Sequence, residues 1–184
     1  MRFKNNKMIM IIKSVAIFLS LFLFSFGYQK FPNFFTSLIF PVNESLFEHL
    51  KMIYTAEIII SLIIYIILKI KNIKINNYFL ALLVSTIFNI GLFYLIYLPI
   101  YNRFGQNLIY TMILYFITLS ISQYLFYLIT LKNHNSFYNI LSIIIIPFLW
   151  IILIYFTYNP LETKFFFDPI KEIYGIPKQK VLKH

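Results

Sequence analysis

The chain has 184 residues, of which 60% are hydrophobic and only 12% are charged, and its formal net charge is +10. Soluble domains average roughly 45–50% apolar and about 25% charged residues, so a soluble fold cannot bury this much apolar surface. Most basic residues sit in short loops and tails, as membrane proteins place them, and no nucleic-acid partner is predicted. Cysteine is absent, which excludes disulfides and thiolate sites. The composition therefore predicts an all-α integral membrane protein whose main partner is the lipid bilayer.

Five apolar runs approach the roughly 20 residues that cross a bilayer as a helix. They lie at about 8–27, 46–68, 78–98, 107–131 and 137–158, with a tail at 159–184. We expect one integral membrane domain, a polytopic transmembrane helical bundle. The first run also resembles a signal peptide because Ser25-Phe26-Gly27 is similar to a cleavage site. A retained span is favoured, since more spans follow and Lys13 can snorkel to the interface.

The densest polar cluster of the first half, residues 41–51, lies at the start of the second span. Here Ser45 and Glu48 have the spacing of a capping box, in which each side chain binds the other residue's amide. In a structural interpretation Glu48 caps the helix, Lys51 pairs with Glu48, and Glu44 is favoured by the positive helix end. This interpretation leaves the cluster with no function beyond starting a helix, in a structural or interaction protein.

Two functional interpretations of the same cluster stay open. As a catalytic site, Glu44, Glu48 and His49 bind a metal or act as acid and base on a lipid-linked or phosphorylated substrate at the outer leaflet. As a gate, the cluster leads to a polar cavity, which fits a small-solute transporter or a substrate-binding membrane component. The cavity candidates are Glu57, Asn89, Thr111, Tyr115, Thr118 and Asp168. No cofactor is specified, because the chain has neither a P-loop nor a dinucleotide fingerprint.

Glu57 lies inside the apolar body of the second span. An ionisable group within a span is costly and is a functional candidate by default. The alternatives are that Glu57 is shallow enough to be hydrated, or that it is protonated and bonded to a neighbouring helix. Asn89, in the third span, is expected to link helices or, alternatively, to contact a substrate.

The fourth span carries a polar stripe at spacings of four, four, three and four residues. Its members are Asn107, Thr111, Tyr115, Thr118 and Ser122. This spacing places them on one helical face. Such a face lines a cavity or packs quietly between helices, and both interpretations stay open.

The distribution of basic residues predicts the orientation. Eight of the 16 basic residues lie in the N-terminal part and around the loops after the second and fourth spans, three lie in the other loops and five in the tail. The tail erodes the bias, but the loops favour an N-terminus in the cytoplasm and a C-terminus outside. An odd number of spans then places the 41–51 cluster and residues 168–177 on the same outer face, where they can form one site. The final lysines, Lys178, Lys180 and Lys183, are expected to form a frayed end.

Two motifs resemble a known family. They are Pro41-Val42-Asn43-Glu44-Ser45 with Glu48-His49-Leu50-Lys51, and a tail with Phe167-Asp168-Pro169 and Tyr174-Gly175-Ile176. Together they are similar to a family of small bacterial integral membrane proteins catalogued as domain of unknown function sixty-five-twelve. The resemblance implies a multi-pass membrane protein with two linked motifs. It supplies no activity, cofactor or catalytic residue, and it leaves open whether partner subunits in the membrane exist.

Overall fold

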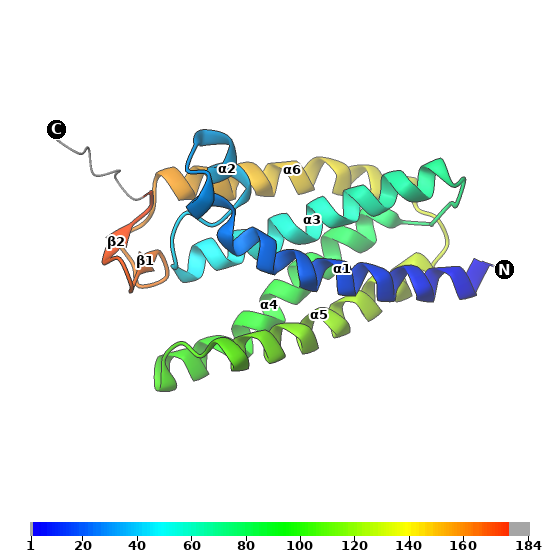
Figure 1. The fold of residues 1–184 in the computed structure, drawn as a ribbon. Coiled ribbons are helices and arrows are strands. Elements are labelled where there is room, and N and C mark those ends of the chain that lie inside the picture. Colours follow the sequence, from blue (N-terminus) through cyan, green and yellow to red (C-terminus); the bar gives the residue numbers. More distant parts are fainter. Residues whose placement is uncertain (1, 177–184) are drawn as a thin grey trace. The chain divides into compact units, whose positions relative to one another are not determined.

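The computed structural model describes residues 2–176, with side chains from Lys7 onward (Figure 1). Five of its helices are long and apolar enough to cross a membrane, which confirms the predicted all-α class. They are α1 (Arg2–Lys30), α3 (Leu46–Ile70), α4 (Tyr78–Phe104), α5 (Leu108–Thr130) and α6 (Ser136–Tyr158). The described part also holds a short helix, α2 (Phe34–Ile39), and an antiparallel pair of strands, β1 (Phe167–Asp168) and β2 (Ile173–Tyr174). The lysines expected to fray lie outside the described residues.

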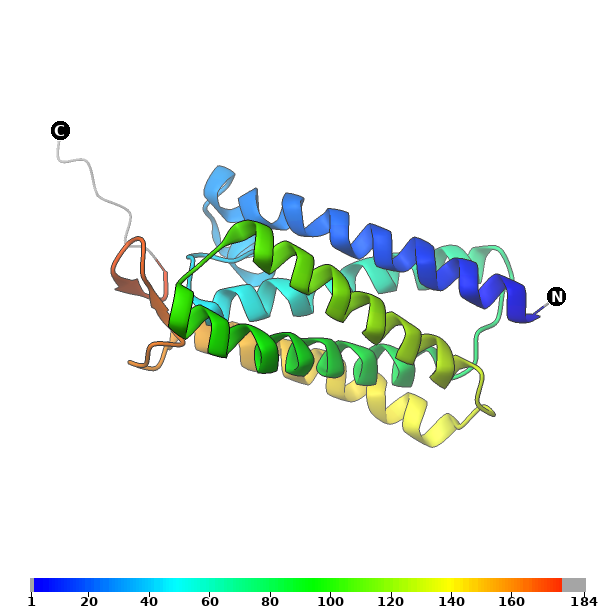
Figure 2. The same cartoon turned by 90° about the horizontal axis from the view of Figure 1, so that it is seen from below.

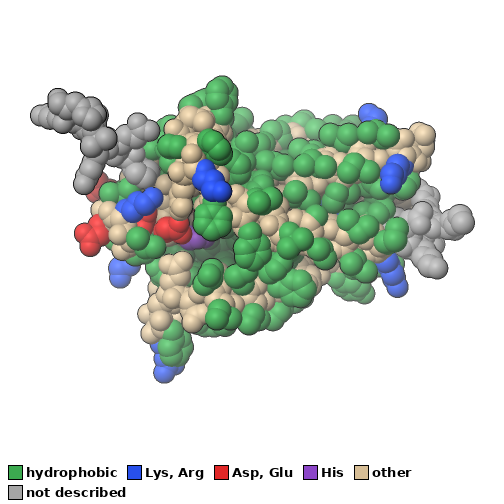
Figure 3. All heavy atoms as spheres, in the orientation of Figure 1, with side chains coloured by type: hydrophobic (Ala, Val, Ile, Leu, Met, Phe, Trp, Pro, Cys, Tyr) green, Lys and Arg blue, Asp and Glu red, His purple; other side chains and the backbone are tan. Residues whose placement is uncertain are grey.

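Helix α5 shows why the long helices suit a bilayer. Its exposed face is apolar, with Ile113 and Ile117 57% and 49% exposed, whereas Tyr115 and Thr118 on the opposite face are buried. This arrangement inverts the soluble pattern, because hydrocarbon solvates the apolar face and the polar side chains find partners only inside the protein. The space-filling view in Figure 3 shows the same preference, with hydrophobic side chains over most of the visible helical surface.

The end of α4 differs from the prediction. The third span was expected to end before Pro99, but α4 continues through it to Phe104 and ends at Gly105, whose φ is 75°. Proline removes only one backbone donor, and in apolar surroundings ending the helix would leave several carbonyls unpaired. The helix therefore ends where glycine permits a positive φ.

Helix α2 was not predicted. Asn33 caps it by accepting from the Thr36 amide at 3.0 Å, and the Thr36 hydroxyl accepts from the Asn33 amide at 3.1 Å. This reciprocal pair is a capping box with Thr in place of Glu. The spacing was present in the sequence, but the prolines on both sides suggested only an irregular connection.

The chain forms two compact units. The described part of the first unit is 2–20 with 56–147, and that of the second unit is 21–55 with 148–176. In the first unit, α4 and α5 lie side by side (Figures 1 and 2). The small residues Ala81, Ser85 and Thr86 are fully buried on α4, which allows close helix packing without bulky side chains. That both units belong to one membrane domain stays a prediction.

One end of the first unit is held by asparagines. Asn139 of α6 accepts from the amides of Phe79 and Leu80 at 3.0 and 3.3 Å and so caps α4. Asn77, which precedes α4, donates to the Asn133 carbonyl at 2.9 Å. The loops after α3 and after α5, which carry the predicted cytoplasmic lysines, therefore lie together.

The second unit has an aromatic core. Phe47 of α3 stacks on Phe166 with ring centroids 4.4 Å apart, and Phe156 of α6 contacts both rings. The Phe47 amide also donates to the Phe165 carbonyl at 2.9 Å. The segment after α6 is therefore an ordered part of this unit.

Candidate functional site

The first polar cluster, in the second unit, is built on Glu48 in the first turn of α3. The side chain is 1% exposed. One oxygen accepts from the Val42 amide at 3.0 Å and lies 2.6 Å from the Lys51 ammonium. The other oxygen accepts from the Thr157 hydroxyl of α6 at 2.8 Å. The predicted ion pair with Lys51 is confirmed, and both carboxylate oxygens have protein partners.

Lys51 completes the same network. Besides Glu48, its ammonium donates to the Ser37 carbonyl of α2 and to the Thr157 hydroxyl, both at 2.9 Å. An ammonium has three donors, so three partners satisfy it. A buried ion pair is stable only when such additional hydrogen bonds complete both ions. We call Glu48, Lys51, Thr157 and the Ser37 carbonyl the closed network.

The helix start differs from the predicted capping box in one half. The Ser45 hydroxyl accepts from the Glu48 amide at 3.3 Å as predicted. The Ser45 amide, however, donates to the Asn43 side chain at 2.9 Å, because Glu48 is held by Lys51 and Thr157. The Asn43 side chain therefore holds the turn before the helix by accepting from the Ser45 amide. Glu48 binds the preceding loop by accepting from the Val42 amide.

Asp168 joins the tail to the 41–51 cluster. It is fully buried, and its carboxylate accepts from the amides of Ile170, Lys171 and Glu44 at 2.8, 3.0 and 3.1 Å. Asn43 makes a second link by donating to the Gly175 carbonyl at 2.7 Å. The 41–51 cluster and the tail, which an odd number of spans places on the same face, are in contact. Asp168 contributes a hydrogen bond to this contact.

Glu44 and His49 are the exposed part of the cluster. The His49 Nε2 lies 3.5 Å from the Glu44 carboxylate, with side chains 28% and 30% exposed. Nδ1 of His49 lies 3.0 Å from the Ser45 carbonyl, which only accepts, so Nδ1 carries a hydrogen. Gln29 donates to the other Glu44 oxygen at 3.4 Å. Within the described residues no three carboxylate or imidazole groups come together as a metal site requires.

The second polar cluster lies in the first unit and is centred on Glu57. This residue is fully buried, so the shallow, hydrated alternative is wrong. Thr86 of α4 donates to one carboxylate oxygen at 2.8 Å, and Asn89 donates to the other. Asn89 thus links α3 to α4, as predicted for helix-to-helix contacts. Glu57 lies eleven residues after the start of α3, about 17 Å along its axis, near the middle of the span.

Lys13 belongs to the same cluster, and the prediction that it snorkels is wrong. Its side chain is fully buried, and its ammonium lies 3.6 Å from the centroid of the Phe126 ring. Glu57 attracts it electrostatically. An acidic group and an aromatic face inside the unit thus compete successfully with the membrane interface for the cation. The sequence signal that we missed was an acid and a base in two separate spans.

This cluster is incompletely bonded. In the described part of the chain, five buried polar atoms lack a hydrogen-bond partner, namely Lys13 Nζ, Asn89 Oδ1, the Tyr115 hydroxyl and both Gln123 side-chain atoms. Tyr115 lies within electrostatic range of Glu57 and near Asn89. Each unpaired buried group costs about 1–3 kcal/mol, so these atoms mark a place where a bound molecule would gain hydrogen bonds. We call Lys13, Glu57, Asn89 and Tyr115 the open cluster.

The rest of the polar stripe on α5 is already satisfied. Thr111 donates to the Asn107 carbonyl at 2.7 Å, and Thr118 donates to the Tyr115 carbonyl at 3.1 Å. The Ser122 hydroxyl donates to the Leu119 carbonyl at 2.8 Å. Because these hydroxyls bond to carbonyls of their own helix, they are consistent with packing between helices. The stripe contributes only Tyr115 to the open cluster.

The helices and the two clusters define a class of protein. It is an α-helical protein with five candidate membrane spans and with buried ionisable side chains in both of its units. The chain belongs to the family described as "Family of unknown function (DUF6512)", whose model matches residues 1–176. The suspected family is thereby confirmed. Comparison with curated proteins and with solved structures gave no match.

Proposed function

We propose that this chain is a multi-pass membrane protein that binds a small polar solute at the open cluster, as a small-solute transporter or as its substrate-binding component. The supporting observation is the buried Lys13 ammonium, which has no hydrogen-bond acceptor among the described residues. A lysine buried within a span is costly, by up to about 3 kcal/mol at its centre. Binding a solute is a physical reason to keep it there.

The unpaired atoms indicate what the solute offers. Lys13 and the Tyr115 hydroxyl are donors and the Asn89 oxygen is an unpaired acceptor, whereas both Glu57 oxygens are already occupied by Thr86 and Asn89. The solute therefore brings acceptor oxygens, as a small carboxylate or phosphate does. Such a group pairs with Lys13 and leaves the Glu57 bonds intact.

The test uses the purified chain in detergent with acetate, phosphate or glycerol as probes. A probe at about 100 times its Kd adds about 2.7 kcal/mol to the free energy of unfolding, which raises the thermal midpoint. We expect acetate or phosphate to raise it in the native chain and in Lys71→Met, a loop lysine, but not in Lys13→Met. A shift that persists in Lys13→Met, or no shift with either anion, would contradict the proposal.

Uptake separates the two forms of the proposal. Proteoliposomes loaded with a probe that binds should exchange it with labelled probe outside if the chain is a transporter. Binding without exchange indicates a substrate-binding component. Lys13→Met should abolish exchange, and Lys71→Met should retain it.

We also propose that the N-terminus is cytoplasmic and the C-terminus lies outside. The joined loops after α3 and α5 carry Lys71, Lys74 and Lys132, and Lys69 lies in the last turn of α3. Basic residues are enriched on the cytoplasmic side. Because the chain lacks cysteine, single cysteines report topology cleanly. A membrane-impermeant maleimide added outside intact cells should label Lys164→Cys and spare Lys71→Cys, and the reverse pattern would invert the orientation.

An acid–base site at His49 and Glu44 is the second candidate, for chemistry on a lipid-linked substrate. Its support is geometric, because the Ser45 carbonyl fixes an exposed imidazole whose Nε2 faces a carboxylate. In a complementation assay, His49→Ala and Glu44→Gln should lose function at normal protein levels, while Lys71→Ala keeps it. Equal tolerance of all three variants would remove this candidate.

A further inference from the structure

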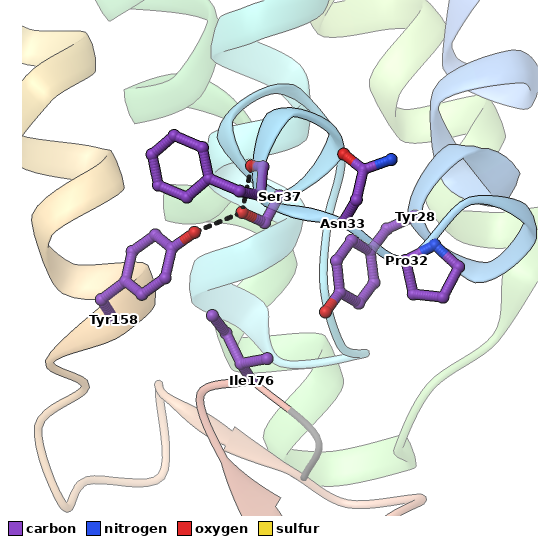
Figure 4. A pocket seen from close by; sticks show the side chains of 7 residues that line it. Tyr28, Pro32, Asn33, Ser37, Tyr158 and Ile176 are labelled. Atoms are coloured by element: carbon purple, nitrogen blue, oxygen red, sulfur yellow. Dashed lines mark hydrogen bonds between the residues drawn. The ribbon is translucent and has the colours of Figure 1, made fainter. Parts of the chain in front are cut away.

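A pocket of about 440 Å³ opens within the second unit, beside the closed network, whose Ser37 also lines it. This volume falls in the roughly 300–1,000 Å³ range of small-molecule sites. Figure 4 shows Tyr158 and Ser37 on one side, Tyr28 and Asn33 on the other, and Ile176 between them. The walls come from α1, α2, the end of α6 and the tail, so the pocket exists only when these segments are assembled.

The pocket lies at the ends of two candidate spans. Helix α1 ends at Lys30 and α6 ends at Tyr158, which lines the pocket. Beside it, the rings of Phe31, Phe34 and Phe35 are 66%, 61% and 76% exposed. Tyrosines, such as Tyr28 and Tyr158 in the pocket lining, concentrate at the level of the lipid headgroups, where the ring has apolar surroundings and the hydroxyl has polar ones. The pocket is therefore placed where lipid glycerol backbones lie.

Its hydrogen-bonding groups are neutral. The Ser37 hydroxyl donates to the Phe34 carbonyl at 2.7 Å and lies 2.6 Å from the Tyr158 hydroxyl, which must therefore donate to it. The Asn33 oxygen accepts from the Thr36 amide, which leaves its amide nitrogen as a donor. The Tyr28 hydroxyl, which makes no hydrogen bond to a described residue, is a second donor. Tyr158 keeps lone pairs that accept.

No charged side chain is among the described lining residues. The nearby Lys51 ammonium donates to the Ser37 carbonyl but is neutralised by Glu48 at 2.6 Å. A phosphate in the pocket would lose hydration without meeting a free cation. We propose that this pocket binds the head region of a neutral membrane lipid, with its ester carbonyl or hydroxyl oxygens on Tyr28 and Asn33, while the chains pass over the exposed phenylalanines.

Photo-crosslinking in nanodiscs tests the site. A diacylglycerol carrying a diazirine near its head is the probe, and unlabelled diacylglycerol, phosphatidylcholine and phosphatidylglycerol are the competitors. We expect crosslinks in peptides covering 28–37 and 158–176, displaced by diacylglycerol and not by the phospholipids. Tyr28→Phe removes one hydrogen bond and should weaken competition about fivefold, whereas Tyr138→Phe, an exposed tyrosine outside the pocket, should not.

A second variant keeps the test independent of hydrogen bonding. Ile176→Trp fills the pocket and should abolish the crosslinks while the chain remains folded, as judged by an unchanged thermal midpoint. Crosslinks spread evenly over all lipid-facing helices would overturn the proposal. Stronger competition by phosphatidylglycerol would overturn it too, because it would assign binding to the exposed Lys30 and to a phosphate. Neither result bears on solute binding at Lys13.

Discussion

The closed network and the open cluster contain the same residue types in opposite states of completion. Each has a buried lysine and a buried glutamate, and the glutamate accepts a hydrogen bond from a threonine, Thr157 in the closed network and Thr86 beside the open cluster. In the closed network three partners lie at 2.6–2.9 Å from the Lys51 ammonium, whereas the Lys13 ammonium has an aromatic ring at 3.6 Å and no described hydrogen-bond partner. Burial of charge alone therefore does not separate a stabilising group from a functional candidate. The number of buried donors without a hydrogen-bond partner separates the two.

The largest expected effect is the loss of one ion from the closed network. Lys51→Met leaves Glu48 buried and uncompensated, which should lower the free energy of unfolding by about 3–5 kcal/mol. SDS titration of the protein in mixed micelles measures this change. Glu44→Gln, which alters an exposed carboxylate in the same loop, should cost at most about 1 kcal/mol. Equal stability of Lys51→Met and the native chain would show that the network is not stabilising.

The matched change in the open cluster should have the opposite sign. Lys13→Met removes a buried ammonium that lacks a hydrogen bond. Because both Glu57 oxygens keep their donors, this gain should outweigh the lost attraction to Glu57, and stability in the same titration should rise by about 2 kcal/mol. A loss as large as that of Lys51→Met would mean that Lys13 is structural. The comparison between the two clusters would then fail.

Asn139→Ala tests whether the gain in stability expected for Lys13→Met arises because the lysine has no hydrogen-bond partner. The alternative is that the first unit tolerates substitutions in general. This variant removes the acceptor of the Phe79 and Leu80 amides and should cost about 1 kcal/mol, as for other helix caps. Hydrogen exchange at the first turn of α4 localises the effect. Unchanged protection there would show that this cap does not stabilise α4. A gain in stability in Lys13→Met could then not be assigned to the missing hydrogen bond of the lysine.

The smallest effect is expected for His49→Ala. The side chain is partly exposed and shares no hydrogen bond with the closed network, so the free energy of unfolding should change by at most about 0.5 kcal/mol. The SDS midpoint measures this, with Lys71→Ala as the reference. A large loss would place His49 among the structural residues and remove it as an acid–base candidate.

The sequence by itself determined the membrane class, the approximate position of five helices and the pairing of Glu48 with Lys51. These follow from apolar run length and from spacing along one helix, which are local properties. The family resemblance rested on two short motifs, at 41–51 and at 167–176. Helix α2 was also encoded locally, in Asn33 and Thr36, but its signal was too short to stand out between prolines.

Only the tertiary structure decided which polar groups are satisfied. Thr157 completes Glu48 from α6, Asn139 caps α4 from α6, and Thr86 bonds Glu57 from α4, and none of these partners is adjacent in sequence. For the same reason Lys13 turned inward against the prediction, since the Phe126 ring that receives it is more than one hundred residues away. In apolar surroundings a polar side chain takes whichever partner packing brings to it. Spacing along one helix cannot show that.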